Sequence, residues 1–285
     1  MVFKAVCVPF LASSLLANSP TPSILLLDGL FVSSHIWLSF SGRPLTDSTR
    51  ELPKQQKMRF NHITSCGLLA AAASVTQATC TERPSLKVPR CPETTTAKFD
   101  KSMPEGNPFP RTEVDLCYDK TSVHMNFKAF EEEHFYFDPD QGINDDIWEY
   151  NVMEAFIHRG ENDPAHYLEF EVNPNNVTYQ AFIYNPTKVR KEGAPFDHFF
   201  VSDPLGDGFT SATVTDREAG TWFSNVTIPL ALWNVDDPES TKWRMNFFRT
   251  ITSPETFPNQ TLGAWSAPNE ANFHVTSFFG DVVFA

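Results

Sequence analysis

Apolar and polar residues alternate along the chain from Val114 to the C-terminus. In residues 122–130, for example, Val123, Met125, Phe127 and Ala129 recur at every second position, which places them on one face of a β-strand. Turn sequences, such as those at residues 173–176 and 203–204, separate these segments. Roughly ten short segments of this kind, with no convincing amphipathic helix, predict an all-β fold, an antiparallel, jelly-roll-like β-sandwich over residues 113–285. The predicted strands are residues 122–130, 134–138, 148–157, 167–172, 177–184, 198–203, 211–216, 221–228, 243–250 and 281–285.

The N-terminal residues follow a different pattern. Residues 1–19 have a basic start and an apolar run, and a second signal-like segment begins at Met58 with Arg59, an apolar stretch over 66–75 and a cleavage-like Thr-Gln-Ala at 76–78. The favoured interpretation is a signal peptide at 58–78, with residues 1–57 as a gene-model extension. A genuine long leader is the alternative. Residues 79–112 are rich in Pro and Thr and lack a period, so they are predicted to form an extended lead-in.

Composition narrows the possible partners. The chain carries a net charge of −13, which argues against nucleic acid as its main partner. No segment outside the predicted leader is apolar enough to suggest a membrane span. A secreted protein with a neutral ligand such as a polysaccharide or oligosaccharide fits these properties.

Secretion changes how the cysteines are interpreted. Cys91 and Cys117 are the preferred disulfide pair because their bond would tie the Pro-rich segment to a predicted strand, and Cys80 competes for either partner. Three sequons support a secreted glycoprotein, at Asn176, Asn225 and Asn259.

Glu154 interrupts the apolar strand at 148–157. Met153, Ala155 and Ile157 form one face, so Glu154 must point the other way, where a solvent-facing role is the simplest interpretation. Glu169 and Glu171 likewise share one strand face, which favours a solvated surface. A glycosidase would need two carboxylates about 5 to 10 Å apart, and the sequence cannot select a pair among 35 acidic residues. No nucleophile elbow, phosphate loop or zincin motif is present.

The residues around Glu154 add a further indication. The segment "IWEYNVMEAFI" at 147–157 resembles the W-x-x-D-x-x-E-x-x-I signature of family-nine carbohydrate-binding modules, within the DOMON-like sandwich group. The segments "YLEFEVNPNN", "VTIPLALW", "WRMNFFRT" and "AWSAPNEANFHVTSFFG" match in the same order, so the resemblance runs from about Val114 to the C-terminus. The mature chain also resembles secreted fungal proteins built on this module alone.

This resemblance implies a site in which two aromatic rings sandwich a sugar and polar groups hold its hydroxyls. Trp148 matches the first aromatic position, Glu154 the polar contact and Phe273 the second aromatic position, where bacterial binders have tryptophan. Glu171 stands where those binders have a basic residue, and Phe248 replaces a polar amide. Asn151 replaces the usual aspartate.

The distance between Trp148 and Glu154 along the chain sets one condition on this site. In a fully extended strand, Trp148 and Glu154 would lie roughly 20 Å apart, too far to hold one sugar ring. The site therefore requires a bend near Glu149 and Tyr150.

The remaining tryptophans, Arg249 and a group of oxygen-bearing residues are further candidates for ligand contact or for structural roles. Trp265 is a further candidate for ligand contact, with core packing as the alternative, whereas Arg249 is expected to form a buried salt bridge. Trp222, Trp233 and Trp243 are expected to pack in or over the core. No cofactor is implied, but family-nine modules bind structural calcium, and its oxygen ligands could come from Asp115, Asp119, Asn144, Asp145 and Asp146.

The favoured function is a secreted module that binds plant or fungal cell-wall polysaccharide by aromatic stacking without catalysis. A glycoside hydrolase or an accessory protein of carbohydrate degradation is one alternative. A structural surface protein with a degenerate sugar site is the other.

Overall fold

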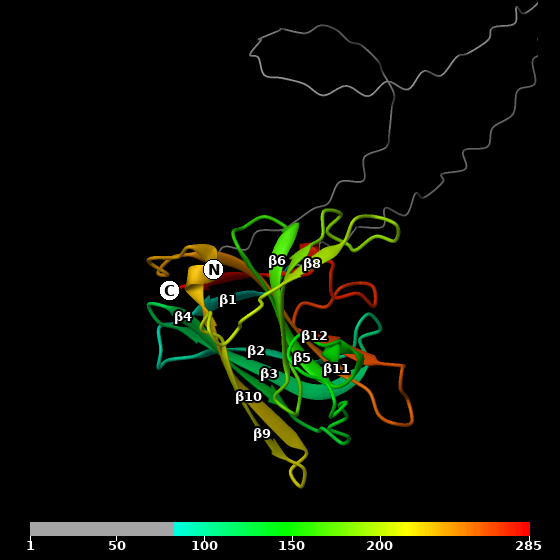
Figure 1. Ribbon diagram of the computed structural model, residues 1–285. Helices are drawn as coiled ribbons and strands as arrows, with labels where there is room; N and C mark the ends of the chain where they lie inside the picture. Colours follow the sequence, from blue (N-terminus) through cyan, green and yellow to red (C-terminus); the bar gives the residue numbers. More distant parts are fainter. Residues whose placement is uncertain (1–82) are drawn as a thin grey trace, which may run out of the picture. The chain divides into compact units, whose positions relative to one another are not determined.

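The computed structural model describes residues 83–285, which form two β-sheets that share one core (Figure 1). An eight-stranded sheet has the order β1-β13-β11-β5-β6-β7-β8, with β12 paired to β11, and a five-stranded sheet has the order β2-β3-β4-β10-β9. The strands of the larger sheet are β1 (Ser85–Val88), β5 (Val152–Arg159), β6 (His166–Val172), β7 (Thr178–Tyr184), β8 (Asp197–Phe200), β11 (Lys242–Ile251), β12 (Thr261–Ala264) and β13 (Gly280–Phe284). Those of the smaller sheet are β2 (Thr95–Lys101), β3 (Pro108–Tyr118), β4 (Ser122–Ala129), β9 (Thr210–Asp216) and β10 (Thr221–Pro229).

These elements confirm the predicted all-β sandwich with mainly antiparallel strands. Among the strands of residues 83–285, only β1 and β13 pair in parallel. Among the described residues, helical structure is limited to the short 3-10 helices η1 (Ile147–Glu149), η2 (Leu230–Trp233) and η3 (Thr276–Phe278). Within this part of the chain, no helix has the length and hydropathy needed to cross a membrane.

The core between the sheets follows the alternation of the sequence. Met153, Ala155 and Ile157 of β5 are fully buried there and meet Met125 and Phe127 of β4, as the period of two predicts. Trp222 and Trp243 are also buried in this core. Trp233 is partly buried and its ring packs edge-on against that of Trp243.

The other face of the larger sheet is also covered. Val152 and Phe156 of β5, on the same side as Glu154, join Tyr167 of β6 and Phe248 of β11 in a second buried cluster. Strands such as β5 and β11 are therefore buried on both faces, a situation that favours apolar residues at consecutive positions.

The expected lead-in is corrected by the structure. Residues 79–112 were expected to be extended and unpacked, yet β1, β2 and the start of β3 lie within this range, and Val88 and Ala97 are fully buried. The segment 134–138, expected to be a strand, is not one. The leader at 1–57, the signal peptide at 58–78 and Cys80 lie outside the described residues.

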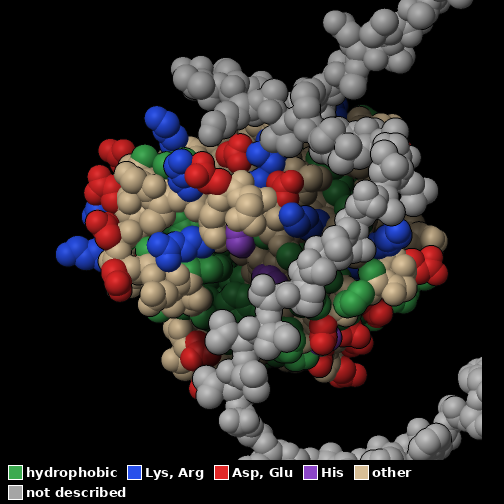
Figure 2. All heavy atoms as spheres, turned by 90° about the horizontal axis from the view of Figure 1, so that it is seen from above, with side chains coloured by type: hydrophobic (Ala, Val, Ile, Leu, Met, Phe, Trp, Pro, Cys, Tyr) green, Lys and Arg blue, Asp and Glu red, His purple; other side chains and the backbone are tan. Residues whose placement is uncertain are grey.

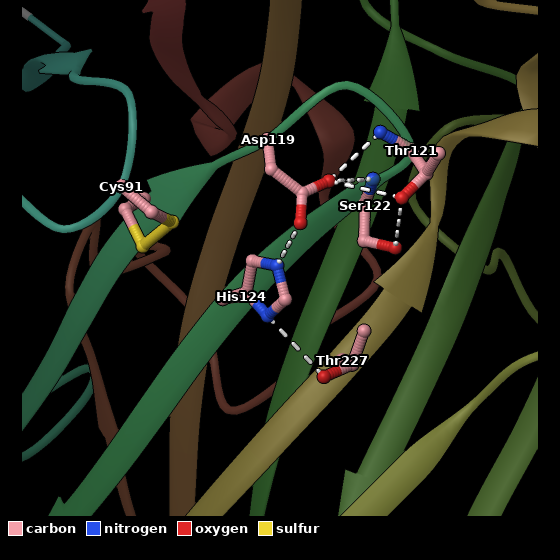
Figure 3. Close-up of a disulfide and its surroundings, with 7 residues drawn as sticks. Cys91, Asp119, Thr121, Ser122, His124 and Thr227 are labelled. Atoms are coloured by element: carbon pink, nitrogen blue, oxygen red, sulfur yellow. Dashed lines mark hydrogen bonds and ion pairs between the residues drawn. A yellow bond between two sulfur atoms is a disulfide. The ribbon is translucent and has the colours of Figure 1, made fainter.

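The disulfide between Cys91 and Cys117 joins the β1–β2 connection to β3 (Figure 3). One residue after β3, Asp119 accepts hydrogen bonds from the backbone N–H groups of Thr121 and Ser122 and lies 2.9 Å from Nε2 of His124. Burial raises the pKa of Asp119, but the hydrogen bonds with His124 and Thr121 outweigh it and lower this pKa to about 2. These contacts fix the β3–β4 turn.

Charged side chains surround an apolar region on the face seen in Figure 2. Hydrophobic side chains gather toward the middle of this face, and lysine, arginine and acidic side chains lie around them. Charges of both signs are interspersed there, so this face does not present the single-sign surface typical of polyanion binders.

Candidate functional site

A cavity of about 360 Å³ opens on the outer side of the larger sheet. Its walls come from η1, from β5 to β8, from the loop at 185–196, and from β11, β12 and the loops on either side of β12. Trp148, Glu154 and Phe273, three residues singled out from the sequence, all line it. The complete lining is Trp148, Glu154, Glu169, Tyr179, Ile183, Arg190, Phe196, His198, Thr250, Gln260, Leu262, Ala271, Asn272, Phe273 and His274.

Trp148 is held in place by its backbone and leaves its ring accessible. The preceding Ile147 is fully buried, and the Trp148 carbonyl accepts a hydrogen bond from Nε2 of Gln260. The indole is 39% exposed and packs edge-on against Tyr179, with ring centroids 5.4 Å apart. A ring that is anchored on one edge and half-open to solvent can receive the face of a ligand.

The bend required between Trp148 and Glu154 is present. Helix η1 ends at Glu149 and β5 begins at Val152, so the two side chains reach one cavity instead of lying at opposite ends of an extended strand. Asn151 fixes this bend: its buried amide donates to Glu132 and accepts from the backbone N–H of Thr252. Asn151 thus has a structural role.

Phe273 enters the cavity from the loop after β12. Its ring stacks on Phe248 of β11, with centroids 4.2 Å apart. The adjacent His274 is buried, shares a 2.7 Å hydrogen bond through Nδ1 with the Tyr167 hydroxyl, and accepts one from Asn185 through its carbonyl. Burial, aided by the charge of Arg190, lowers the pKa of His274 to about 3, so the imidazole is neutral.

Three buried glutamates form the polar part of this region. Glu154 and Glu169 line the cavity, and Glu171 lies beneath them, fully buried. Burial raises the pKa of all three carboxyls, that of Glu169 to about 8, and for Glu154 and Glu171 neighbouring glutamates raise it further. The solvent-facing alternative for Glu154 and the solvated face favoured for Glu169 and Glu171 are therefore wrong, because the loops that form the cavity cover this face. Glu171 was also a candidate for sugar contact, and the structure corrects this, because its side chain is fully buried and does not line the cavity.

Two further residues considered from the sequence, Trp265 and Arg249, lie outside the cavity lining. Trp265 does not line the cavity: it packs against Phe247, and a side chain at Gly280 would come within 2.3 Å of its ring. This is the core-packing alternative. Arg249 forms the expected buried salt bridge, with Nη2 3.0 Å from Oε2 of Glu132.

The five oxygen-bearing residues considered for calcium are not brought together. Asp115 pairs with Lys128, and Asp119 holds the turn after β3, both in the smaller sheet. Asn144 contacts the backbone of Val201 and Gln180 beside the larger sheet. The residues between 144 and 146 thus lie apart from the other two. All three sequon asparagines, Asn176, Asn225 and Asn259, are exposed.

Sequence reasoning missed several residues of the cavity. Tyr179 beside Trp148, Arg190 and Phe196 of the loop at 185–196, and the pair of histidines at 198 and 274 had not been singled out. Only Tyr179 left a signal, since it falls on the strand face shared with Glu171 across β6 and β7. His198 lies in β8, and Arg190, Phe196 and His274 come from loops whose position no local pattern encodes.

Comparison with known proteins finds one relative of high sequence identity. No family model matches the chain. It is 59% identical over 201 residues to a protein of Arthroderma benhamiae named "Extracellular protein", covering 70% of this chain and 90% of that protein.

Solved structures are similar at the level of the fold. A candidate carbohydrate-binding protein from Bacteroides uniformis superposes with a TM-score of 0.55 at 16% identity, covering 72% of this chain and 100% of that one. Two structures of a family 9 carbohydrate-binding module from Caldicellulosiruptor kristjanssonii, with cellotriose and with glucose, give TM-scores of 0.48 and 0.47. They are 11% and 12% identical and cover 70% and 71% of this chain and 93% and 96% of their own.

The B. uniformis likeness supports the β-sandwich fold, and the high identity to the A. benhamiae protein establishes kinship. The chain belongs to the same family as this fungal extracellular protein.

Proposed function

We propose that this protein is a secreted, non-catalytic module that binds a saccharide of plant or fungal cell-wall polysaccharide in the cavity lined by Trp148, Glu154 and Phe273. The observation that carries the proposal is a half-exposed tryptophan ring at the mouth of a cavity with buried carboxylates inside. A sugar ring has an apolar C–H face and a rim of hydroxyls, so it needs an aromatic surface together with hydrogen-bonding groups.

The size of the cavity suits a small ligand segment. Ligand pockets usually measure about 300 to 1,000 Å³, and this one lies near the lower end at about 360 Å³. Gln260, Asn272 and Glu154 supply donors and acceptors around its apolar walls. These features favour recognition of one or two sugar units of a longer chain.

Three observations support secretion. The A. benhamiae relative is named an extracellular protein. The Cys91–Cys117 disulfide suits an oxidising compartment. The three exposed sequon asparagines are available for glycosylation.

The carboxylates also justify testing for hydrolysis. In glycosidases two carboxyl groups flank the scissile bond at about 5 to 5.5 Å or about 6.5 to 9.5 Å. Here the nearest oxygens of Glu154, Glu169 and Glu171 all lie within 4.8 Å of one another, as a cluster on adjacent strands. The two that line the cavity, Glu154 and Glu169, come from adjacent strands of one sheet and not from opposite walls, so they do not flank a bound glycosidic bond, which favours binding over cleavage.

A glycan array supplemented with insoluble cell-wall polysaccharides tests the proposal, scored for both retention of the protein and release of reducing sugar. Retention without cleavage is the expected result. Cleavage would assign a hydrolase, and neither retention nor cleavage would leave a surface protein with a degenerate site. Either of these outcomes would overturn the proposal.

A further inference from the structure

Glu154, Glu169 and Glu171 bring three carboxyl groups to one point of the larger sheet. Glu154 of β5 lies directly opposite Glu171 of β6, and Glu169 lies two residues before Glu171 on the same face. One oxygen of each residue lies within 4.8 Å of those of the other two. Their exposed fractions are 3%, 7% and 0%, in the order of the sequence.

These carboxyl groups lack the partners that buried acids normally have. Within residues 83–285, no lysine, arginine or histidine forms an ion pair with any of the three. Both carboxyl oxygens of Glu171 are buried without a hydrogen-bond partner. Unpaired buried polar groups are rare in folded proteins because each loses its hydrogen bonds to water without replacement, at a greater cost when the group is charged. Glu171 therefore points to a partner supplied from outside the chain.

The spacing of the oxygens suits a metal ion. Calcium binds oxygen ligands at about 2.3 to 2.6 Å, so two of its ligands can be no more than about 5 Å apart. The nearest oxygens of the three glutamates lie within 4.8 Å of one another, so they satisfy this condition. Carboxylates and water are the ligands that calcium, magnesium and manganese prefer.

The charges around the three glutamates and the open cavity above them also suit a divalent cation. Arg190 lines the cavity, and its charge lowers the pKa of Glu169 without forming an ion pair. Three carboxylates, one guanidinium and one divalent cation sum to zero charge. Glu154 and Glu169 line the open cavity, so an ion can enter there and complete its coordination with water.

We propose that Glu154, Glu169 and Glu171 bind a divalent cation of the calcium class at the floor of the cavity. This site is separate from the acidic residues at 115, 119 and 144–146. It does not require that the protein bind a glycan.

Calcium titration of the chelator-treated secreted protein by isothermal calorimetry tests the proposal. We expect one ion per chain and a rise in Tm on binding. Loss of a residue that only orients a metal ligand typically lowers metal affinity roughly 10- to 100-fold. Glu171→Gln removes a ligand itself, so it should lower the affinity for calcium at least tenfold. The matched control Glu239→Gln removes an exposed acid of the loop before β11 and should leave the affinity unchanged.

Terbium provides a second readout that does not depend on heat. Trp148 and Tyr179 line the same cavity as Glu154 and Glu169, so excitation of these rings should sensitise the emission of bound terbium, and calcium should quench it by competition. Absence of both calcium binding and sensitised emission would overturn the proposal. So would calcium binding that Glu171→Gln leaves unchanged. Because no glycan is present, these outcomes are independent of the glycan array.

Discussion

Glu154 of β5 and Glu171 of β6 are directly opposite residues in the sheet, and both are buried, Glu154 at the wall of the cavity and Glu171 outside its lining. Like charges at opposite positions of neighbouring strands destabilise a sheet, and burial adds the cost of removing each charge from water. The pair is therefore tolerated when protons or a cation neutralise it. This relationship links the stability of the fold to the ligand state of its cavity.

Stability of the metal-free protein should fall as pH rises from 7 to 8. In this window the unfolded carboxyls are ionised, whereas the raised pKa of about 8 lets Glu169 retain a proton in the folded state. The folded state then binds more protons, so each extra proton lowers the free energy of unfolding by about 1.4 kcal/mol per pH unit. Urea unfolding of chelator-treated protein at several pH values measures this slope.

His274 determines the pH at which the decline in stability begins. Its folded pKa of about 3 lies below the ordinary histidine value, so it contributes an opposite slope, with stability rising as pH increases toward about 6.5. Above pH 7 this contribution is nearly complete. Glu169→Gln removes this titrating group and should flatten the decline between pH 7 and 8. A wild-type stability that stays constant or rises over this window would contradict the account.

Arg249 should be essential to the fold through its pairing with Glu132. The exposed fractions of their side chains are 0% and 1%, and Arg249 also donates to the Phe130 carbonyl. Arg249→Met would leave Glu132 buried and uncompensated, which typically costs roughly 3 to 5 kcal/mol. Chemical denaturation would measure the loss. The control Arg90→Met removes an exposed partner of Glu239 and should change stability little, and equal losses in both variants would refute the assignment.

The Tyr167 hydroxyl should position the loop that carries Phe273. Tyr167→Phe leaves Nδ1 of His274 buried without its partner, at a cost of roughly 1 to 3 kcal/mol. We expect lower stability and weaker glycan retention together, measured by unfolding and by a pull-down on the retained polysaccharide. Tyr184→Phe is the control, because its ring packs beside His166 at a partly exposed position. If Tyr167→Phe affected neither property, the loop would be held by other contacts.

The sandwich could be predicted from the sequence because its inner face follows a local rule. Alternation put Met153, Ala155 and Ile157 inward, and the structure buries all three. The first two strands escaped prediction because Pro and Thr in residues 79–112 mask any period, while β1 gains its place by pairing with β13 nearly two hundred residues away.

The candidate site was predictable only in part. Trp148, Glu154 and Phe273 were selected by resemblance, and the structure brings them to one cavity. The burial of Glu169 and Glu171 could not be predicted because it depends on the loops at 185–196 and 265–279, which cover the sheet through contacts distant in sequence, such as the hydrogen bond from Asn185 to His274. The local hints were Val152 and Phe156, apolar residues on the face of Glu154 that a solvated surface would not favour.

The affinity of Trp148→Ala for the glycan that the wild-type protein retains tests the central claim most directly. Losing one stacking surface should cost roughly 1 to 3 kcal/mol, or about ten- to a hundredfold in affinity. Because Trp148 is 39% exposed, the loss of stability should be smaller than the roughly 3 to 5 kcal/mol that truncating a fully buried tryptophan costs. Phe223→Ala, a partly buried aromatic on β10 of the smaller sheet, is the control and should retain the glycan fully. Unchanged affinity in Trp148→Ala, or a loss matched by Phe223→Ala, would contradict the account.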